Sequence, residues 1–453
     1  MIDYLKLTNF RAFKSQRFFF KRLNIFIGKN NSGKSSALSA LNVIAQTMQN
    51  QELDGTPLLL NGQFDNLGTF IDVVNGNVSR RKMAIELGFG KWSARTEFKY
   101  RGQRRQIELS DFELTEDGNS RFSLSERKDA YDLKVGNTKF EDLFPKMQKR
   151  RPKFNNFWPT QSIPLDMSMN LEDRKSVAWQ TVRDANRSLF HAKRHLLDCF
   201  GNFDSVSPFR DQPQRTYLYS GETAKRIGTT GSNTAIMLAA DASRRGALRK
   251  NLVGQVSEWF NYTGIARGLS VESLTPRHFE LCLVSNDGSK HNICDVGFGC
   301  SQVLPVLVSG LSLFSEDDHR RARPRILIVQ EPEIHLHPDA QAAMGSFFAN
   351  LATKSGQIFI ETHSDNLVLR IARHVALGDI NAEDVAIFYI SDDPEERVTE
   401  ISISETGSFE PDWPNGFFPQ RQTESLMLAR AAMKKRTSNV QKQMNFQYPD
   451  FSE

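Results

Sequence analysis

Several features that would assign the chain to a special class of protein are missing. The sequence of 453 residues has four cysteines and no C-x-x-C pair, so neither a disulfide framework nor a zinc ribbon is indicated. It has no apolar run long enough to cross a bilayer and no recognisable signal peptide. A formal net charge of only +5 permits contact with nucleic acid but does not argue for it. We therefore expect a globular protein in the reducing cytoplasm, away from membranes.

Internal repeats and long coiled coils are missing as well. The longest amphipathic pattern predicts a helix that ends near Gly201, with apolar residues at steps of three and four. These residues are Val182, Ala185, Leu189, Ala192, Leu196 and Cys199. The pattern lasts fewer than three heptads, which is too short to indicate a coiled coil. The helix either packs on its own domain, which we favour, or docks a partner.

The sequence does contain an apolar strand, a glycine-rich turn and a helix in direct succession. Residues 28–35 fit the pattern G-x-x-x-x-G-K-S, in which glycines free the backbone amides to surround phosphate groups. Lys34 is predicted to reach the β- and γ-phosphates, and the Ser35 hydroxyl to bind Mg²⁺. The predicted nucleotide-binding residues are consecutive: Gly28, Lys29, Asn30, Asn31, Ser32, Gly33, Lys34, Ser35 and Ser36. We conclude that the chain has a nucleoside-triphosphate site.

A short apolar run at residues 326–329 predicts a strand that is buried on both faces. In phosphate-loop ATPases such a strand places one acidic residue beside Mg²⁺ and a second one that polarises the attacking water. Glu331 is predicted to take the second role, as general base. Gln330 stands where the first acid is usual, and its amide can still hydrogen-bond a Mg²⁺-bound water. ATP binding should therefore survive, while hydrolysis is expected to be slow.

Further segments carry candidate site residues. His363 follows a predicted strand at residues 358–360 and is placed to donate to the γ-phosphate. Gln63 lies in a loop-rich stretch and is a candidate Mg²⁺ ligand. The start of an apolar helix exposes backbone amides and a hydroxyl suited to a γ-phosphate, at Gly297, Gly299, Ser301 and Gln302. His335 and His337 lack a nearby third metal ligand, so we interpret them as part of a turn at a subunit interface.

These blocks resemble, in family order, the ABC-type ATPases of the RecF/SMC and OLD (overcoming lysogenisation defect) group. The resemblance covers most of residues 1–420 and depends on N-F-R-A-F at 9–13, G-K-N-N-S-G-K-S at 28–35, D-V-G-F-G-C-S-Q at 295–302, E-P-E-I-H-L-H-P at 331–338 and E-T-H-S at 361–364. Stand-alone bacterial members that share D-W-P-x-G-F-F, here at 412–418, are the most similar. By resemblance, residues 28–35 are the Walker A loop and 297–302 the signature motif. Gln330 and Glu331 then close the Walker B strand, and His363 is the switch histidine.

The resemblance implies an α/β fold, an ABC-type ATPase head with a mixed, mainly parallel core sheet. Four segments are expected: 1–139, the first half of the head with the Walker A loop and an antiparallel β lobe; 140–275, an inserted, mainly helical subdomain that opens on a basic run; 276–420, the second half of the head; and 421–453, a basic tail.

In the family that the chain resembles, each ATP is held between the Walker A loop of one subunit and the signature motif of another. ATP and Mg²⁺ would thus join a homodimer or a higher homo-oligomer. Stand-alone members resemble the ATPase subunits of antiphage systems such as PARIS and Septu, which pair with a separately encoded nuclease or toxin. The resemblance therefore implies an ATPase that senses infection or controls such an effector. The alternatives are a RecF-like DNA-binding clamp in repair, and a scaffold that binds ATP without hydrolysing it.

Overall fold

The computed structural model describes residues 1–50, 57–127, 130–143, 154–159, 176–218, 221, 224–246, 249–315, 324–393, 396–414 and 427–428. The basic run at residues 146–153 and nearly all of the predicted tail at 421–453 lie outside these residues. Within the described part of the chain, no helix combines the length and the apolar composition needed to span a membrane.

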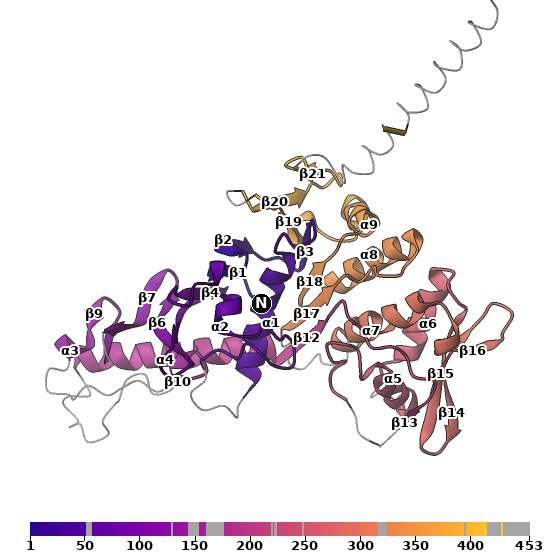
Figure 1. Ribbon diagram of the computed structural model, residues 1–453, viewed down its shortest axis with the longest axis horizontal. Coiled ribbons are helices and arrows are strands. Elements are labelled where there is room, and N and C mark those ends of the chain that lie inside the picture. Colours follow the sequence, from indigo (N-terminus) through magenta and orange to yellow (C-terminus); the bar gives the residue numbers. More distant parts are fainter. Residues whose placement is uncertain are drawn as a thin grey trace, which may run out of the picture.

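A seven-stranded sheet lies at the centre of the described residues (Figure 1). Its strands run in the order β12 (Asn202–Val206), β17 (Arg325–Gln330), β18 (Gln357–Glu361), β3 (Leu23–Gly28), β19 (Val385–Ile390), β20 (Val398–Ile403) and β21 (Phe409–Glu410). The first five strands are parallel to one another, β20 is antiparallel to β19, and β21 is antiparallel to β20. The sheet is therefore mixed, as predicted. The parallel strands bring the ends of β3, β17 and β18 to the same edge, where such sheets bind ligands.

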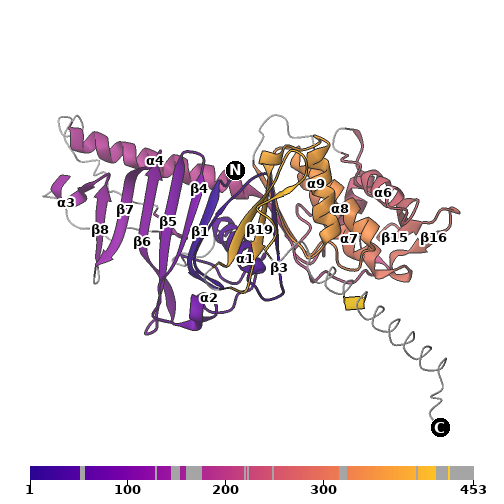
Figure 2. The same ribbon diagram turned by 90° about the horizontal axis from the view of Figure 1, so that it is seen from above.

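An eight-stranded antiparallel sheet forms the second large layer (Figure 2). Its strands run in the order β2 (Phe13–Phe19), β1 (Tyr4–Phe10), β4 (Met83–Phe89), β5 (Trp92–Arg101), β6 (Gln106–Glu116), β7 (Asn119–Arg127), β8 (Ala130–Val135) and β9 (Thr138–Lys139). Alternation of apolar and polar residues at 83–89 and 96–115 predicts this sheet. Burial alternates along β5 and over most of β6, whereas β4 is buried at six of its seven positions.

Aromatic side chains join the two sheets. The ring of Phe18 on β2 lies 5.9 Å from that of Phe26 on β3 and 5.4 Å from that of Phe388 on β19. Phe20 packs edge-on against Phe359 of β18, with ring centroids 4.9 Å apart. All five rings are buried, so this cluster holds the antiparallel lobe against the strand that leads into the phosphate loop.

Helices cover both faces of the core sheet. Helix α1 (Lys34–Gln49) and helix α4 (Val177–Gly201) share one core with the antiparallel sheet, along which α4 runs in Figure 2. The other face is covered by α7 (Phe298–Leu313) and α8 (Pro338–Ala352), and α9 (Asp365–Ala376) packs on α8. Helices α5 (Thr234–Ser243) and α6 (Leu252–Tyr262) pack against α7, beyond the core sheet. A small sheet of β13 (Tyr217–Leu218), β14 (Gly268–Thr275), β15 (His278–Val284) and β16 (Lys290–Asn292) joins that side.

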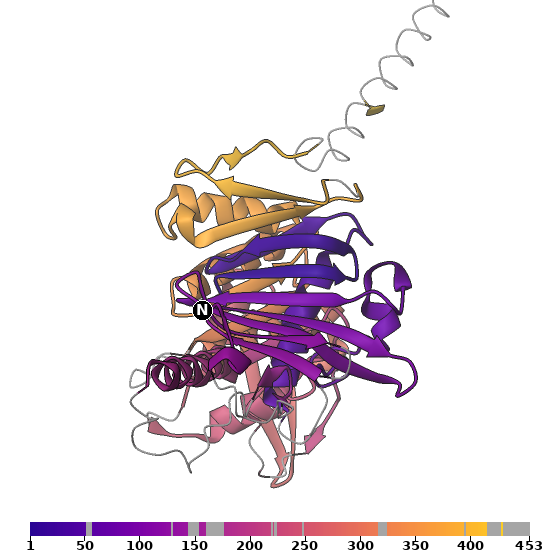
Figure 3. The ribbon, with the colours of Figure 1, turned by 90° about the vertical axis from the view of Figure 1, so that its left-hand side faces the viewer.

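The remaining helices and strands are short. They are α2 (Phe70–Val73), η1 (Asn75–Asn77), α3 (Phe140–Leu143), β10 (Phe154–Asn155), β11 (Trp158–Pro159), η4 (Ile293–Asp295) and η5 (Ala382–Asp384). In Figure 3, viewed from the side of the antiparallel sheet, the orange and yellow C-terminal elements lie above the indigo strands.

The predicted amphipathic helix is confirmed, and it packs on its own domain. All six of its periodic apolar residues are buried in α4, and α4 contacts α1, β7 and β8. The predicted insertion at residues 140–275, however, is not a separate helical unit. Strand β12 pairs with β17 in the core sheet, and the boundary at residue 275 falls inside the hairpin formed by β14 and β15. Backbone hydrogen bonds thus join the expected insertion to the second half of the head in two places.

Candidate nucleotide-binding site

The turn between β3 and α1 has the backbone that a phosphate loop requires. Gly28 and Gly33 have φ angles of 151° and 111°, and Asn31 between them has a φ of 64°. A Cβ atom on Gly28 would lie 2.0 Å from the carbonyl oxygen of Ile390, and one on Gly33 would lie 2.6 Å from the Cβ of Ala12. Glycine is therefore needed at both positions, for conformation and for space.

The Lys34 ammonium lies folded over this turn. Its Nζ donates to the carbonyl oxygens of Gly28 at 3.1 Å and Lys29 at 2.6 Å. Burial lowers the pKa of Lys34, and the carboxylate of Glu361 opposes this change more than any other group. A nearly buried cation above a ring of backbone amides is suited to bind phosphate oxygens.

The Ser35 hydroxyl lies against a carboxylate from a neighbouring strand. Ser35 Oγ donates to Oε1 of Glu361 at 2.8 Å, and Gln330 Nε2 donates to Oε2 of the same carboxylate at 2.8 Å. The sequence analysis placed Gln330 at this site but gave no role to Glu361, because nothing in the local pattern distinguishes it from other strand ends.

Glu331 directly follows β17 in an unusual backbone conformation. Its φ is 47°, in the left-handed region that residues other than glycine rarely adopt. Its backbone N–H donates to the carbonyl oxygen of Glu361 at 2.7 Å, which fixes the turn. The structure therefore places the predicted general base beside Gln330, at the same edge of the sheet as the phosphate loop.

His363 and Glu333 lie at the same edge of the core sheet as the phosphate loop. Strand β18 ends two residues before His363, whose backbone N–H donates to Oε1 of Glu333. Burial lowers the pKa of His363, the charge of Lys34 lowers it further, and Glu361 opposes both. Burial also raises the pKa of Glu333, which is only 8% exposed. The predicted switch histidine thus lies within electrostatic reach of Lys34.

Arg210, in the loop after β12, is a site residue that the sequence analysis missed. It is 8% exposed, and its Nη2 donates to the carbonyl oxygens of Gln330 at 2.8 Å and Glu331 at 3.0 Å. Its Nη1 donates to the carbonyl oxygen of Gln302 in α7 at 3.1 Å. Isolated arginines in loops give no sequence signal, and only the fold brings this one to the site.

The rim of the phosphate loop has two more partners that the sequence analysis did not assign. Asp392 pairs with Lys29 at 3.6 Å, and Arg397 Nη1 donates to the carbonyl oxygen of Ser32 at 3.0 Å. Asp392 begins an acidic segment at residues 392–396, of which residues 394 and 395 lie outside the described residues. Its first residue therefore faces the loop.

The predicted signature motif lies at the start of α7. Gly297 is the residue before the helix, and Ser301 Oγ donates to the carbonyl oxygen of Phe298 at 2.8 Å. A Cβ atom on Gly299 would lie 2.4 Å from the carbonyl oxygen of His335, so the helix start packs closely on the turn that follows Glu331. The Gln302 side chain is buried, and its Nε2 has no hydrogen-bond partner.

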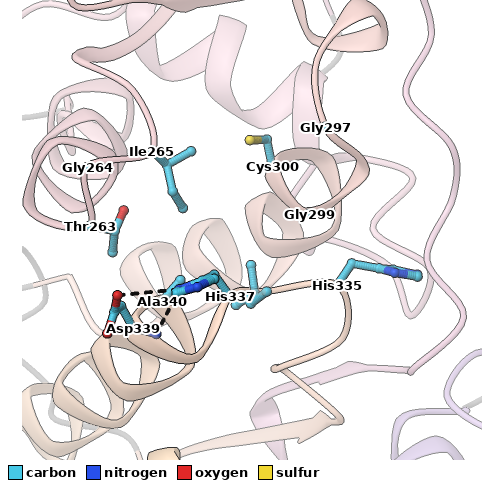
Figure 4. Close-up of a pocket in the computed structure, with 11 residues that line it drawn as sticks. Thr263, Gly264, Ile265, Gly297, Gly299, Cys300, His335, His337, Asp339 and Ala340 are labelled. Carbon is cyan, nitrogen blue, oxygen red and sulfur yellow. Dashed lines mark hydrogen bonds and ion pairs between the residues drawn. The ribbon is translucent and has the colours of Figure 1, made fainter.

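This helix start borders an open pocket of about 360 Å³ (Figure 4). The residues that line it include Gly297, Gly299, Cys300, His337 and Asp339. Figure 4 shows the Cys300 sulfur directed toward Ile265, whereas the His335 ring turns away. Of the predicted signature residues, Gly297 and Gly299 line this pocket and Ser301 and Gln302 do not. The hydrogen bonds of Lys34 go to Gly28 and Lys29 instead.

The prediction that Gln63 binds Mg²⁺ is wrong. Its Nε2 donates to Oε1 of Gln49, the last residue of α1, at 2.8 Å. Lys34 and Ser35 begin the same helix, and a helix of this length spans about 22 Å. Gln63 thus lies at the opposite end of α1 from the phosphate loop.

The donors around Ser35 fit a magnesium ion. They are oxygen atoms, namely the Ser35 hydroxyl and the Glu361 carboxylate, with the Gln330 amide beside them. Mg²⁺ prefers oxygen ligands and in such sites takes few from the protein, because water and phosphate oxygens complete its octahedron. The described residues hold no cluster of three or more His, Cys, Asp or Glu side chains.

Comparisons with solved structures find SMC heads at low similarity. They include an SMC head bound to the C-winged helix domain of ScpA, with a TM-score of 0.37 and 10% identity over 89% of this chain and 98% of that chain. The SMC head domain from Thermotoga maritima matches with a TM-score of 0.35 and 9% identity, over 89% of this chain and 99% of that chain. An SMC head derived from Pyrococcus furiosus, bound to the C-terminal domain of ScpA, matches with a TM-score of 0.36 and 12% identity, over 95% of this chain and 99% of that chain. Scores this low carry no argument about function.

Two family models match parts of the chain. No curated protein matches the chain. A family of unknown function, DUF3696, matches residues 380–428, which include Trp413, a buried residue packed against Tyr389 and Phe409. The model of the AAA ATPase domain, AAA_15, matches residues 1–199 and 218–368, which hold the phosphate loop, Glu331 and His363. The predicted α/β fold of a phosphate-loop ATPase head is thus confirmed, and the chain belongs to the AAA ATPase domain family.

Proposed function

We propose that this ATPase binds Mg²⁺-ATP between two copies of itself and that the resulting homodimer or higher homo-oligomer controls a separately encoded effector. The main support is the division of the site within one protomer. Lys34, Glu331 and His363 gather at one edge of the core sheet, whereas the start of α7 borders a separate open pocket. A second copy could bring its α7 to the first copy's triphosphate.

The chemistry of α7 supports this arrangement. Gly297 and Phe298 are exposed at the helix start, where backbone amides can meet an anion, although the Cys300 amide already donates to the carbonyl oxygen of Gly297 at 3.1 Å. The turn after Glu331 packs against the same helix start through Gly299 and His335. An anion bound there would therefore lie next to a segment that continues directly from the general base.

A complementation experiment tests the shared site. Lys34→Ala removes the phosphate-binding ammonium, and Gly297→Glu places a negative charge on the pocket. Gly297 suits this purpose because a Cβ atom there meets nothing within 4 Å. Each variant alone should be inactive. Mixed one to one, they should regain about a quarter of the wild-type rate, because half of the random dimers are mixed and each holds one intact site. A mixture as inactive as its components would contradict the proposal.

A second variant addresses assembly. Glu331→Gln should still bind ATP but lose the general base, and so it should trap the closed, ATP-bound oligomer. Light scattering after size exclusion measures the mass with and without Mg²⁺-ATP. Identical masses for wild type and Glu331→Gln under both conditions would count against an ATP-joined assembly. Lys34→Ala is the control: it should not bind ATP, so its mass should be the same with and without Mg²⁺-ATP.

We further propose that the effector is a nuclease or toxin and that the system acts in antiphage defence. The support is the resemblance of the motif blocks to ATPase subunits of two-gene defence systems. The test is to express the chain with the neighbouring genes of its genome and to challenge the cells with phages. Wild type should reduce plating, and Lys34→Ala should not. Equal plating for both, across a broad set of phages, would contradict a defence role.

The alternative of a RecF-like DNA clamp has less support. Several basic residues on the antiparallel sheet are paired, among them Arg101 with Glu108 and Glu126, and Arg104 with Glu108. Such pairing leaves little free positive charge for phosphates on this face. Duplex binding that strengthens with ATP and weakens steeply with salt would nevertheless establish the clamp and displace the effector proposal.

A further inference from the structure

At the ends of two neighbouring strands, an amide stands where an acid is usual, and an acid stands opposite it. Strand β17 ends at Gln330 and strand β18 at Glu361, and the two residues are register partners in the parallel pair. The amide thus stands where a phosphate-loop ATPase usually carries an acid beside Mg²⁺, and an acid stands on the adjacent strand. Both lie at the edge of the sheet that holds the phosphate loop.

The Glu361 carboxylate is directed at the hydroxyl that begins α1. Oε1 accepts from Ser35 Oγ and Oε2 accepts from Gln330 Nε2, each at 2.8 Å. The residue is only 4% exposed, and its own carbonyl oxygen accepts from the backbone of Glu331 at 2.7 Å. One residue therefore contacts the predicted Mg²⁺ ligand on one side and the general base on the other.

A buried carboxylate requires compensation by hydrogen bonds or by positive charge. Two hydrogen bonds are in place, and the ammonium of Lys34 lies within electrostatic reach. A purely structural pair could have used an uncharged side chain on β18 at lower desolvation cost. The charge becomes favourable when a divalent cation enters with the nucleotide.

We propose that Glu361 supplies the protein carboxylate for the Mg²⁺ of bound ATP, and that Gln330 is a positioning residue that holds this carboxylate through its amide. Ser35 would contribute the hydroxyl, and the nucleotide and water the remaining oxygens. Slow hydrolysis was expected because Gln330 is not an acid. With Glu361 as the acid, that reason for slow turnover no longer applies.

The inference rests on ATP binding at the phosphate loop but not on dimerisation or on an effector. The test measures how much Mg²⁺ strengthens nucleotide binding. Affinity for the slowly hydrolysed analogue ATPγS is determined by equilibrium dialysis, first in EDTA and then in saturating Mg²⁺. The ratio of the two dissociation constants is the Mg²⁺-linked gain. Electron paramagnetic resonance of Mn²⁺ in place of Mg²⁺ reports metal binding directly.

Glu361→Gln should keep the wild-type affinity in EDTA and lose about tenfold or more of the Mg²⁺-linked gain, together with the bound Mn²⁺ signal. The double variant Gln330→Glu/Glu361→Gln returns the acid to β17 and should recover most of both. A Glu361→Gln protein with the full Mg²⁺-linked gain would overturn the inference. A double variant no better than Glu361→Gln would count against the exchange of roles.

If Glu361→Gln does not fold, Glu361→Asp decides the question, because it keeps the charge and withdraws it by one methylene. A reduced Mg²⁺-linked gain with unchanged affinity in EDTA supports the inference, and an unchanged gain overturns it. A protein that remains monomeric in ATP would contradict the proposed function while leaving these binding results intact.

Discussion

Arg210 donates from Nη2 to the carbonyl oxygen of Glu331 at 3.0 Å and, through Nη1, to that of Gln302 at 3.1 Å. One buried side chain therefore joins the predicted general base to the helix that carries the signature motif. Burial lowers the pKa of Arg210 to about 10, so the guanidinium remains charged at neutral pH. Any movement of α7 on meeting a partner would be transmitted through this group to the backbone of Glu331.

Replacement of this arginine should affect both stability and catalysis. Arg210→Ala removes three hydrogen bonds that a charged donor makes to backbone carbonyl oxygens, and it should lower the free energy of unfolding by about 3 kcal/mol. Arg210→Lys should recover little, because an ammonium cannot make the same planar set of bonds. Urea denaturation measures the stability, and phosphate release measures hydrolysis. The matched control is Arg215→Ala, since Arg215 makes an exposed pair with Asp295 that should be dispensable. Equal effects of the two substitutions would contradict the role of Arg210.

A second prediction concerns Asp204, a buried carboxyl on β12. Burial raises its pKa from the ordinary 3.8 to about 6. Between these values the native state binds more protons than the unfolded state, so stability falls as pH rises through this window. Asp204→Asn should abolish that loss, worth about 3 kcal/mol between pH 4 and 6.5. Denaturation curves at several pH values measure it, and parallel curves for variant and wild type would contradict it.

A partner of Asp204 provides a test in the opposite direction. Ser309 on α7 donates to Oδ2 of Asp204 at 2.9 Å, and this bond favours the ionised form. Ser309→Ala should therefore raise the pKa of Asp204 further and extend the pH-dependent loss of stability to higher pH. If the loss moved to lower pH instead, the assignment of this dependence to Asp204 would be wrong.

Local sequence was sufficient to predict the phosphate loop. Its turn requires Gly28 and Gly33 at fixed spacing, and a strand and a helix on either side satisfy the same motif. The long helix α4 was predictable for a similar reason, because its buried stripe repeats along a single element. Both features depend on residues that are close together in the chain.

Glu361 and Arg210 could not be found in this way. Their partners lie 326 and 121 residues away in sequence, at Ser35 and Glu331. Their roles depend on the strand order, which a single sequence does not specify. Gln63 failed for the opposite reason: its place in the order of motifs was suitable, but the loop that carries it returns to the far end of α1.

His363 offers a third prediction. It lies after β18, within reach of the Lys34 charge, and burial lowers its pKa. His363→Ala should reduce the rate of hydrolysis by about 100-fold while leaving ATP affinity unchanged, because a lost proton donor in the transition state does not weaken ground-state binding. Single-turnover phosphate release and equilibrium dialysis separate the two quantities. A large loss of affinity with an unchanged rate would assign His363 to binding instead.

The last prediction concerns the coupling of ATP to folding through Lys34. At an ATP concentration of 100 times the dissociation constant, wild type should gain about 2.7 kcal/mol of stability, because only the native state binds the ligand. Lys34→Ala should gain nothing, since the ammonium that lies over the loop is removed. Lys29→Ala is the matched control. Lys29 contributes to the loop through its backbone, and its side chain makes a mostly exposed pair with Asp392, so this variant should keep most of the gain. Thermal denaturation with and without Mg²⁺-ATP measures all three proteins. An ATP-dependent gain that survived in Lys34→Ala would place the nucleotide elsewhere, and every role assigned to Glu331, Glu361 and His363 would then have to be abandoned.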